Sequence, residues 1–152
     1  MIIEKLLSLQ KTKAAKIVLY AYKYKGTNQV KDMKKMMVWA MGNYSRFVRP
    51  GAVRLDIDAY NDEGDIVKEG DTRPYGTMLS AYRNVDGKLV VVAINYSDRL
   101  CPITLNVDGK PHRWNMYRTS DISAESLLPI GSAIDKTTLT PRSITTFVSE
   151  GQ

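Results

Sequence analysis

Short apolar segments separated by turn residues, at a spacing of roughly ten positions, constrain the fold of this chain most strongly. The tetrapeptide Val-Asp-Gly-Lys occurs at 85–88 and again at 107–110. Because Asp-Gly tolerates the positive φ of a type I′ turn, each copy predicts a β-hairpin. Between the two turns, the run 89–94 (Leu-Val-Val-Val-Ala-Ile) has no polar face. That run predicts a central strand that is covered on both sides.

Further strands are predicted before and after these turns. Residues 53–60 alternate between apolar and polar side chains, as a strand with one solvated face does. Residues 119–141 are rich in turn residues, and Leu127, Leu128 and Ile134 are the expected apolar anchors there. The pattern predicts a mainly β fold, an antiparallel β-sandwich preceded by one or two helices. The other predicted strands are 78–84, 103–107, 112–117 and 143–149.

Residues 30–49 carry the periodicity of a helix. Apolar side chains recur there at spacings of three and four, which places them on one face. Met36, Trp39 and Phe47 widen this face, so we expect the helix to pack on more than one neighbour. The helix is expected to stop beside Pro50, because a residue that precedes proline is pushed out of the helical region, and Gly51 is expected to allow a turn there.

Basic residues are concentrated in the N-terminal third. Residues 1–50 hold eleven lysines and arginines against two acidic residues, whereas residues 51–152 hold eleven against fourteen. A basic segment can bind nucleic acid, but no nucleic-acid-binding motif accompanies these lysines, so a solvated surface is the expected role. The chain is therefore divided into an unassigned basic segment at 1–29, the helix at 30–49 and a β-sandwich at 50–150.

Targeting and processing signals are weak in this sequence. No run of eighteen apolar residues occurs, so no membrane-spanning helix is expected. The first residues lack the charged and apolar regions of a secretory signal, and the sequence predicts no compartment. Asn43 and Asn95 each begin an Asn-Tyr-Ser glycosylation pattern, but the first lies in a predicted helix end, which makes it a poor acceptor.

Candidate catalytic and metal-binding residues are few. Cys101 and His112 are the single cysteine and the single histidine, which excludes an internal disulfide, cysteine-based metal sites and most zinc sites. Asp56 and Asp58 share a predicted strand face, but no third oxygen-rich group accompanies them, so a solvated edge is expected rather than a cation site. The sequence therefore predicts no catalytic residue, no metal and no cofactor.

Three segments give the chain a family resemblance. They are Trp-Ala-Met-Gly-Asn-Tyr-Ser-Arg-Phe-Val-Arg-Pro-Gly-Ala-Val-Arg at 39–54, Leu-Val-Val-Val-Ala-Ile-Asn-Tyr-Ser at 89–97 and Pro-Arg-Ser-Ile-Thr-Thr-Phe at 141–147. In this order and spacing they resemble the C-terminal region of glycoside hydrolase family 30, which includes glucosylceramidases, glucuronoxylanases and endo-β-1,6-galactanases. The first segment is most similar to the endo-β-1,6-galactanase branch.

The resemblance implies a non-catalytic part of an enzyme. In that family a (β/α)₈ barrel cleaves the glycoside with two glutamates, and its last helix runs into a β-sandwich that packs on the barrel. A complete barrel needs about 250 residues, and no position here matches either glutamate. The resemblance thus implies that 30–49 is the last barrel helix and 50–150 the accessory sandwich. It implies a separately encoded catalytic barrel as partner and a β-linked polysaccharide as substrate. Members of the family are typically secreted or periplasmic, so the resemblance also implies one of these locations.

Two other functions fit the residues. A stand-alone carbohydrate-binding sandwich would present Tyr82, Trp114 and Tyr117 as a flat aromatic strip on which sugar rings stack. A basic interaction protein would act through residues 1–35, with binding that weakens as salt rises. In the absence of a barrel, the apolar faces of the helix and sandwich would be exposed or buried in a homodimer.

Overall fold

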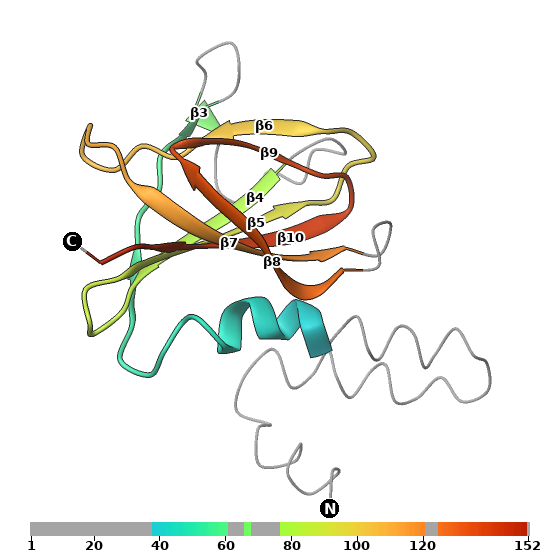
Figure 1. Ribbon diagram of the computed structural model, residues 1–152. Helices are drawn as coiled ribbons and strands as arrows, with labels where there is room; N and C mark the ends of the chain where they lie inside the picture. Colours follow the sequence, from blue (N-terminus) through green and yellow to red (C-terminus); the bar gives the residue numbers. More distant parts are fainter. Residues whose placement is uncertain (1–37, 61–65, 68–76, 121–124, 152) are drawn as a thin grey trace, which may run out of the picture.

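The computed structural model describes residues 38–60, 66–67, 77–120 and 125–151. Within this part of the chain, a helix at 38–45 precedes ten β-strands (Figure 1). Strand pairing is antiparallel throughout, which confirms the predicted fold class. No helix in these ranges is long and apolar enough to cross a membrane. The predictions made for residues 1–37 lie outside the described residues.

The strands belong to one large sheet and two small ones. Strands β1, β4, β5, β10, β7 and β8 form a six-stranded sheet in that order, while β6 pairs with β9 and β2 pairs with β3. Figure 1 shows the β6–β9 ribbon on one face of the large sheet and the helix on the opposite face. The strands are β1 Val53–Leu55, β2 Ala59–Tyr60, β3 Ile66–Val67, β4 Thr77–Arg83, β5 Leu89–Asn95, β6 Cys101–Thr104, β7 Arg113–Ser120, β8 Glu125–Ile134, β9 Lys136–Leu139 and β10 Ser143–Ser149.

The main core lies between the six-stranded sheet and the β6–β9 ribbon. Trp114 and Met116 of β7 and Phe147 of β10 project from the sheet, and Leu139 projects from the ribbon. The rings of Trp114 and Phe147 meet edge to face, with centroids 6.5 Å apart and planes at 87°, an arrangement that the ring quadrupoles favour. The alternation predicted for 112–117 therefore delivers two large side chains to one side of the sheet.

Strand β5 is covered on both faces, as the apolar run predicted. Val91 and Ala93 belong to the core cluster beneath the ribbon. Val90 and Val92 point to the other face and are equally inaccessible. Val92 stands opposite Thr146 in the ladder, and Thr146 contacts the helix through hydrogen bonds. The helix thus covers the second face of the sheet, and this is the reason that a strand without a polar side can be accommodated.

Two predicted segments differ from the structure. Residues 53–60 form two short strands rather than one, with β1 ending at Leu55 and β2 beginning at Ala59. Residues 119–141 contain the long strand β8 and strand β9, which the mixed composition concealed. Leu127 is an apolar anchor as expected, but Leu128 and Ile134 are exposed, because bulges in β8 break the alternation that would have buried them.

The two Val-Asp-Gly-Lys copies adopt different turns. At 107–110, both central residues have positive φ (52° and 68°) and Lys110 N donates to Val107 O, as in the predicted type I′ turn. At 85–88, Gly87 takes the left-handed conformation and Asp86 does not, and the pair Asn84–Lys88 encloses a three-residue loop. The turn at 107–110 does not form the predicted hairpin, because the strands before and after it are not paired with each other. Strand β6 pairs with β9, and β7 lies in the large sheet.

The helix ends earlier than its periodicity predicts. Helical geometry stops at residue 45, and Phe47 N and Val48 N both donate to Tyr44 O in a closing turn. The chain then reverses at Pro50-Gly51, where Ala52 N donates to Arg49 O (2.9 Å) and Gly51 has φ of +85°. Glycine tolerates this left-handed conformation without the cost that a Cβ imposes, so the predicted turn is confirmed.

Candidate functional site

The three candidate sugar-stacking residues do not form one strip. Trp114 is 1% exposed and lies in the core beneath the ribbon, so neither ring face is available to a sugar. Tyr82 and Tyr117 lie on the opposite face of the sheet, next to the helix. Their rings contact Tyr44 (centroids 6.3 Å) and Phe47 (centroids 4.4 Å). Alternation along β7 places residue 114 and residue 117 on opposite faces, which corrects the expectation of a shared surface.

The contact between the helix and the large sheet is the most elaborate polar feature in the described chain. We call it the seam and define it by Asn43, Asn84, Thr119, Leu127 and Thr146. These residues come from the helix, from the strand β4–β5 connection and from β7, β8 and β10. The seam joins positions up to 103 residues apart in the sequence, so it holds the helix to the sheet and is not a local cap.

Asn43 is the centre of the seam. Its side chain is 0% exposed, and its Nδ2 donates both hydrogens, to Trp39 O (2.9 Å) and to Thr119 Oγ1 (2.7 Å). The hydroxyl of Thr146 donates toward both oxygens of Asn43, at 2.8 Å and 2.9 Å. Every polar atom of the buried amide is therefore paired, which offsets the cost of removing it from water.

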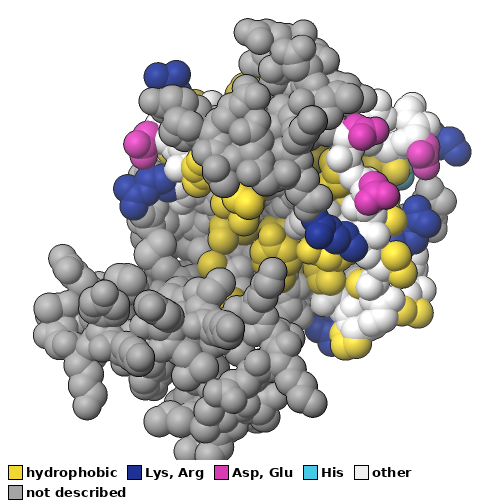
Figure 2. All heavy atoms as spheres, turned by 180° about the vertical axis from the view of Figure 1, so that it is seen from behind, with side chains coloured by type: hydrophobic (Ala, Val, Ile, Leu, Met, Phe, Trp, Pro, Cys, Tyr) yellow, Lys and Arg dark blue, Asp and Glu magenta, His cyan; other side chains and the backbone are white. Residues whose placement is uncertain are grey.

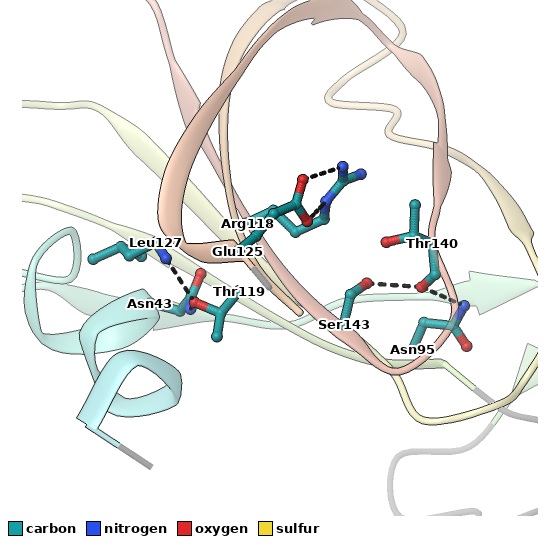
Figure 3. Close-up of polar contacts among 8 residues, drawn as sticks. All are labelled: Asn43, Asn95, Arg118, Thr119, Glu125, Leu127, Thr140 and Ser143. Carbon is teal, nitrogen blue, oxygen red and sulfur yellow. Dashed lines mark hydrogen bonds and ion pairs between the residues drawn. The ribbon is translucent and has the colours of Figure 1, made fainter. Parts of the chain in front are cut away.

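The seam continues from Thr119 into β8. Thr119 Oγ1 accepts a second hydrogen bond from Leu127 N (3.1 Å), and Figure 3 shows Asn43, Thr119 and Leu127 gathered around this hydroxyl. Gly42 lies against the Leu127 side chain, so closely that an added Cβ would meet Leu127 Cδ2 at 3.1 Å. The helix therefore fits against β8 through a residue that has no side chain.

Asn84 holds the other end of the helix segment. Its Nδ2 donates to Phe47 O (2.8 Å), and its Oδ1 accepts from Arg49 N (3.0 Å). Both backbone groups lie in the turn that follows the last helical residue, 45. The side chain of one loop residue thus replaces a helix cap, and it does so from a hairpin that is 35 residues away.

Asn95 performs a similar task on the ribbon side. Its Nδ2 donates to Arg99 O (2.8 Å) and Thr140 O (3.0 Å), and its Oδ1 accepts from Ser97 Oγ (2.8 Å). Ser143 Oγ also donates to Thr140 O (2.7 Å), as Figure 3 shows. Both asparagines of the Asn-Tyr-Ser patterns are therefore buried structural residues in the folded chain.

These asparagines were missed as functional residues by reasoning from the sequence. Their amide chemistry was recognised only as a glycosylation pattern at Asn43 and Asn95. The available signal was their place inside the segments at 39–54 and 89–97 that carry the family resemblance. The third segment, 141–147, contains Thr146, the partner of Asn43. The resemblance therefore rests on the residues that join the helix, the sheet and the ribbon.

The remaining candidates have structural surroundings. Asp56 and Asp58 are exposed, and no group of three metal-ligating side chains occurs among the described residues. His112 Nδ1 lies 3.0 Å from Lys110 O, and Cys101 Sγ lies 3.0 Å from Thr77 Oγ1. Among the residues that the structure describes, neither group is hydrogen-bonded to a second group with which it could act as nucleophile and base.

One ion pair lies partly inside the sandwich. Arg118 of β7 and Glu125 of β8 form two parallel contacts, with Arg118 Nη2 at 2.6 Å from Glu125 Oε1. Each side chain is about one-sixth exposed, 17% and 14% respectively. Figure 3 shows the two groups facing each other. A carboxylate whose two oxygens are both bound by one guanidinium is held in a structural ion pair.

The helix carries apolar side chains that the sheet leaves exposed in part. Val38 is 65% exposed, and Trp39 and Met41 are each 38% exposed. Apart from the helix, Figure 2 shows further hydrophobic side chains in the middle of the described surface as seen from behind. The helix was predicted to pack on more than one neighbour, and its second face is available for this. The arrangement can hold and position a partner.

Comparison with known proteins agrees with this architecture. The glycosyl hydrolase family 30 beta sandwich domain matches residues 51–147. A conserved exported protein from Bacteroides fragilis is 32% identical, with a TM-score of 0.55, over 74% of this chain and 21% of that chain. No curated protein matches the sequence.

Two solved enzymes share the fold. A GH30 endoxylanase from Clostridium papyrosolvens C71 is 24% identical with a TM-score of 0.55, over 76% of this chain and 28% of that chain. The family 30 subfamily 8 xylanase Xyn30A from Clostridium acetobutylicum is 21% identical with a TM-score of 0.56, over the same shares of the two chains, 76% and 28%. The present chain therefore spans between a fifth and a third of the length of these solved proteins.

Proposed function

This chain belongs to the glycosyl hydrolase family 30 β-sandwich family, and from that premise we propose that it is an accessory domain that docks onto a catalytic (β/α)₈ barrel. The barrel would be supplied from outside these residues, because the chain matches only 21% to 28% of the proteins to which it is similar. In this role the sandwich positions a barrel and performs no hydrolysis by itself.

The observation that carries the proposal is the seam together with the exposed side of the helix. Asn43 and Asn84 hold the helix segment to the sheet at two points, so the helix is fixed to the sandwich. Val38, Trp39 and Met41 then present apolar area on a surface whose position is set by the sheet. Exposed apolar side chains on a fixed element are typical of an interface with another protein body.

The substrate of the assembled enzyme is proposed as a β-linked polysaccharide of the β-1,6-galactan type. Support comes from the segment at 39–54, whose amino-acid sequence is most similar to that of the endo-β-1,6-galactanase branch. The solved relatives named as xylanases act on a different polysaccharide, so the choice of branch needs its own test. Hydrolysis of β-1,6-galactan, β-1,6-glucan and glucuronoxylan by the purified chain alone is expected to be undetectable.

Association with a barrel provides the decisive experiment. The probe is the catalytic barrel of an endo-β-1,6-galactanase, produced without its own sandwich and mixed with this chain. Co-elution in size-exclusion chromatography and a rise in β-1,6-galactan hydrolysis are expected. Val38→Lys places a charge on the exposed helix face and should abolish co-elution. Val85→Lys makes the same change at an 81% exposed position in the β4–β5 turn and should leave it intact.

Failure of the unmodified chain to co-elute would refute docking, and equal effects of the two lysine variants would refute the helix as the docking surface.

Two alternative functions are tested with the same purified chain. Tyr82 and Tyr117 remain candidate polysaccharide contacts, and calorimetric titration with β-linked glycans tests them. Light scattering of the chain alone tests whether the same apolar surface forms a homodimer.

A further inference from the structure

Leu127 has a backbone conformation that is unusual for its side chain. Its φ is +53°, in the left-handed region that glycine, asparagine and aspartate enter readily and that a bulky apolar residue avoids. The residue is nevertheless 7% exposed, whereas Leu128 beside it is 49% exposed. Contacts with neighbouring residues must stabilise this backbone conformation, because a non-glycine residue keeps an unfavourable φ only where the surrounding structure requires it.

The ladder between β7 and β8 shows what the conformation accomplishes. Arg118 pairs with Leu128 and Ser120 pairs with Glu125, so Thr119 stands opposite two residues of β8. This is a β-bulge, in which one extra residue is accommodated and a side chain is redirected. The bulge turns the Leu127 side chain toward the helix and turns its N–H toward Thr119 Oγ1.

Two contacts with the helix maintain the bulge. The hydroxyl of Thr119 accepts from both Leu127 N (3.1 Å) and Asn43 Nδ2 (2.7 Å), so one atom joins β8 to the helix. The Leu127 side chain packs on Gly42, where no side chain intervenes. Without the helix, the bulge would lose its apolar contact, and the Thr119 hydroxyl would lose the amide that orients it.

We propose that the left-handed bulge at Leu127 is a conformational latch that closes only while the helix at 38–45 is seated on the sheet. In the unseated state, residues 125–128 relax to an extended conformation in which Leu127 no longer faces the helix. The helix and the start of β8 then form one two-state element. A change that unseats the helix therefore favours the extended form of residues 125–128, and a change that extends these residues favours the unseated helix. The inference concerns the chain alone and does not rest on docking to a barrel.

The test perturbs the helix at a point that does not touch Leu127. Thr146→Val removes the hydroxyl that donates to Asn43 and keeps the side-chain shape. The matched control is Ser149→Ala, which removes one partly buried hydrogen bond, accepted from Leu89 N, on the opposite face of the same strand. Amide hydrogen exchange is followed at Leu127, and the rate is divided by that of Val91 in the core to remove any global loss of stability.

The expected result is a normalised Leu127 exchange rate that rises roughly tenfold in Thr146→Val and changes less than about twofold in Ser149→Ala. Backbone chemical shifts of Leu127 should move from left-handed toward extended values only in the first variant. An unchanged rate in Thr146→Val, or equal rises in both variants, would overturn the proposal. If Thr146→Val does not fold, Asn84→Ala serves instead, since it releases the other end of the helix segment and has no hydrogen bond to Leu127.

The reciprocal experiment starts from β8. Leu127→Val places a β-branched residue, which tolerates positive φ less well, at the bulge. Leu128→Val makes the same change at the exposed neighbour. The indole N–H resonance of Trp39 reports the helix and should shift and broaden in the first variant only. A Trp39 signal that is the same in both variants would also contradict the latch.

Discussion

Replacing Asn43 by aspartate changes one buried group and separates hydrogen bonding from charge. The partners of the Asn43 side chain are Trp39 O and the hydroxyls of Thr119 and Thr146, none of which is charged. In the Asn43→Asp variant the Nδ2 donor is lost, and a carboxyl group of nearly the same shape lies at a site with 0% exposure. Burial without a cation disfavours the ionised form, so the pKa of the introduced carboxyl should rise well above its usual range.

The magnitude follows from proton linkage. In the unfolded chain the new carboxyl titrates with a pKa of about 3.9, and in the folded chain it titrates at a higher pH. Between these two values the folded state binds more protons, so the free energy of unfolding falls by about 1.4 kcal/mol for each pH unit. For a fully buried carboxyl the upper pKa reaches about 7 or more, so the loss between pH 4 and pH 7 amounts to roughly 4 kcal/mol.

The Asn43→Ala variant provides the matched control. It loses the hydrogen bonds of Nδ2 and also the one that Oδ1 accepts from Thr146, at a cost of about 2–3 kcal/mol, but it introduces no titrating group. Urea denaturation at pH 4, 5, 6 and 7, followed by tryptophan fluorescence, gives the free energy of unfolding of each variant relative to the unmodified chain. The difference between the two variants should be small at pH 4 and should grow steadily toward pH 7, with the aspartate variant less stable.

Two results would refute the reasoning. If the two variants lose the same free energy at every pH, the introduced carboxyl is solvated and the helix is not seated on the sheet as described. If neither variant is destabilised by more than about 0.5 kcal/mol, the amide does not connect the helix to the sheet in solution.

Three further substitutions test other parts of the fold by urea or thermal denaturation. Thr145→Val removes a buried hydroxyl that has no hydrogen-bond partner and should stabilise the chain by about 1 kcal/mol, and a loss would indicate a partner such as a bound water. Asn84→Ala should cost about 2 kcal/mol, because Phe47 O and Arg49 N lose their partner, and no loss would contradict the cap. Gly51→Ala should cost about 1–2 kcal/mol because of its φ of +85°, and a neutral result would contradict that turn.

Much of the sheet could be predicted from the sequence because its strands follow local periodicities. The uninterrupted apolar run at 89–94 required cover on both faces, and the structure supplies the ribbon on one and the helix on the other. The alternation at 112–117 assigned Trp114 to one face, yet it did not say which face was solvated. The sequence pattern was therefore compatible with Trp114 as a sugar contact, whereas the structure places its side chain in the core.

The candidate site could be predicted only in outline. The helix period at 30–49 and the following turn indicated a junction, and the family resemblance indicated what lies on each side of it. Asn43 resembled a glycosylation acceptor because a three-residue pattern carries no information on burial. Its partners Thr119 and Thr146 are 76 and 103 residues away, and contacts at such separations leave no local periodicity to detect.

The sequence by itself determined the antiparallel fold and the double burial of β5. It did so because these properties depend on side-chain type and spacing along a short stretch. Only the tertiary structure decided that Asn43 pairs with Thr119 and Thr146, that Leu127 is left-handed and that one Val-Asp-Gly-Lys copy forms a type I′ turn while the other does not. Those outcomes depend on which distant backbone and side-chain groups are available as partners, because buried polar groups must pair wherever the fold brings them.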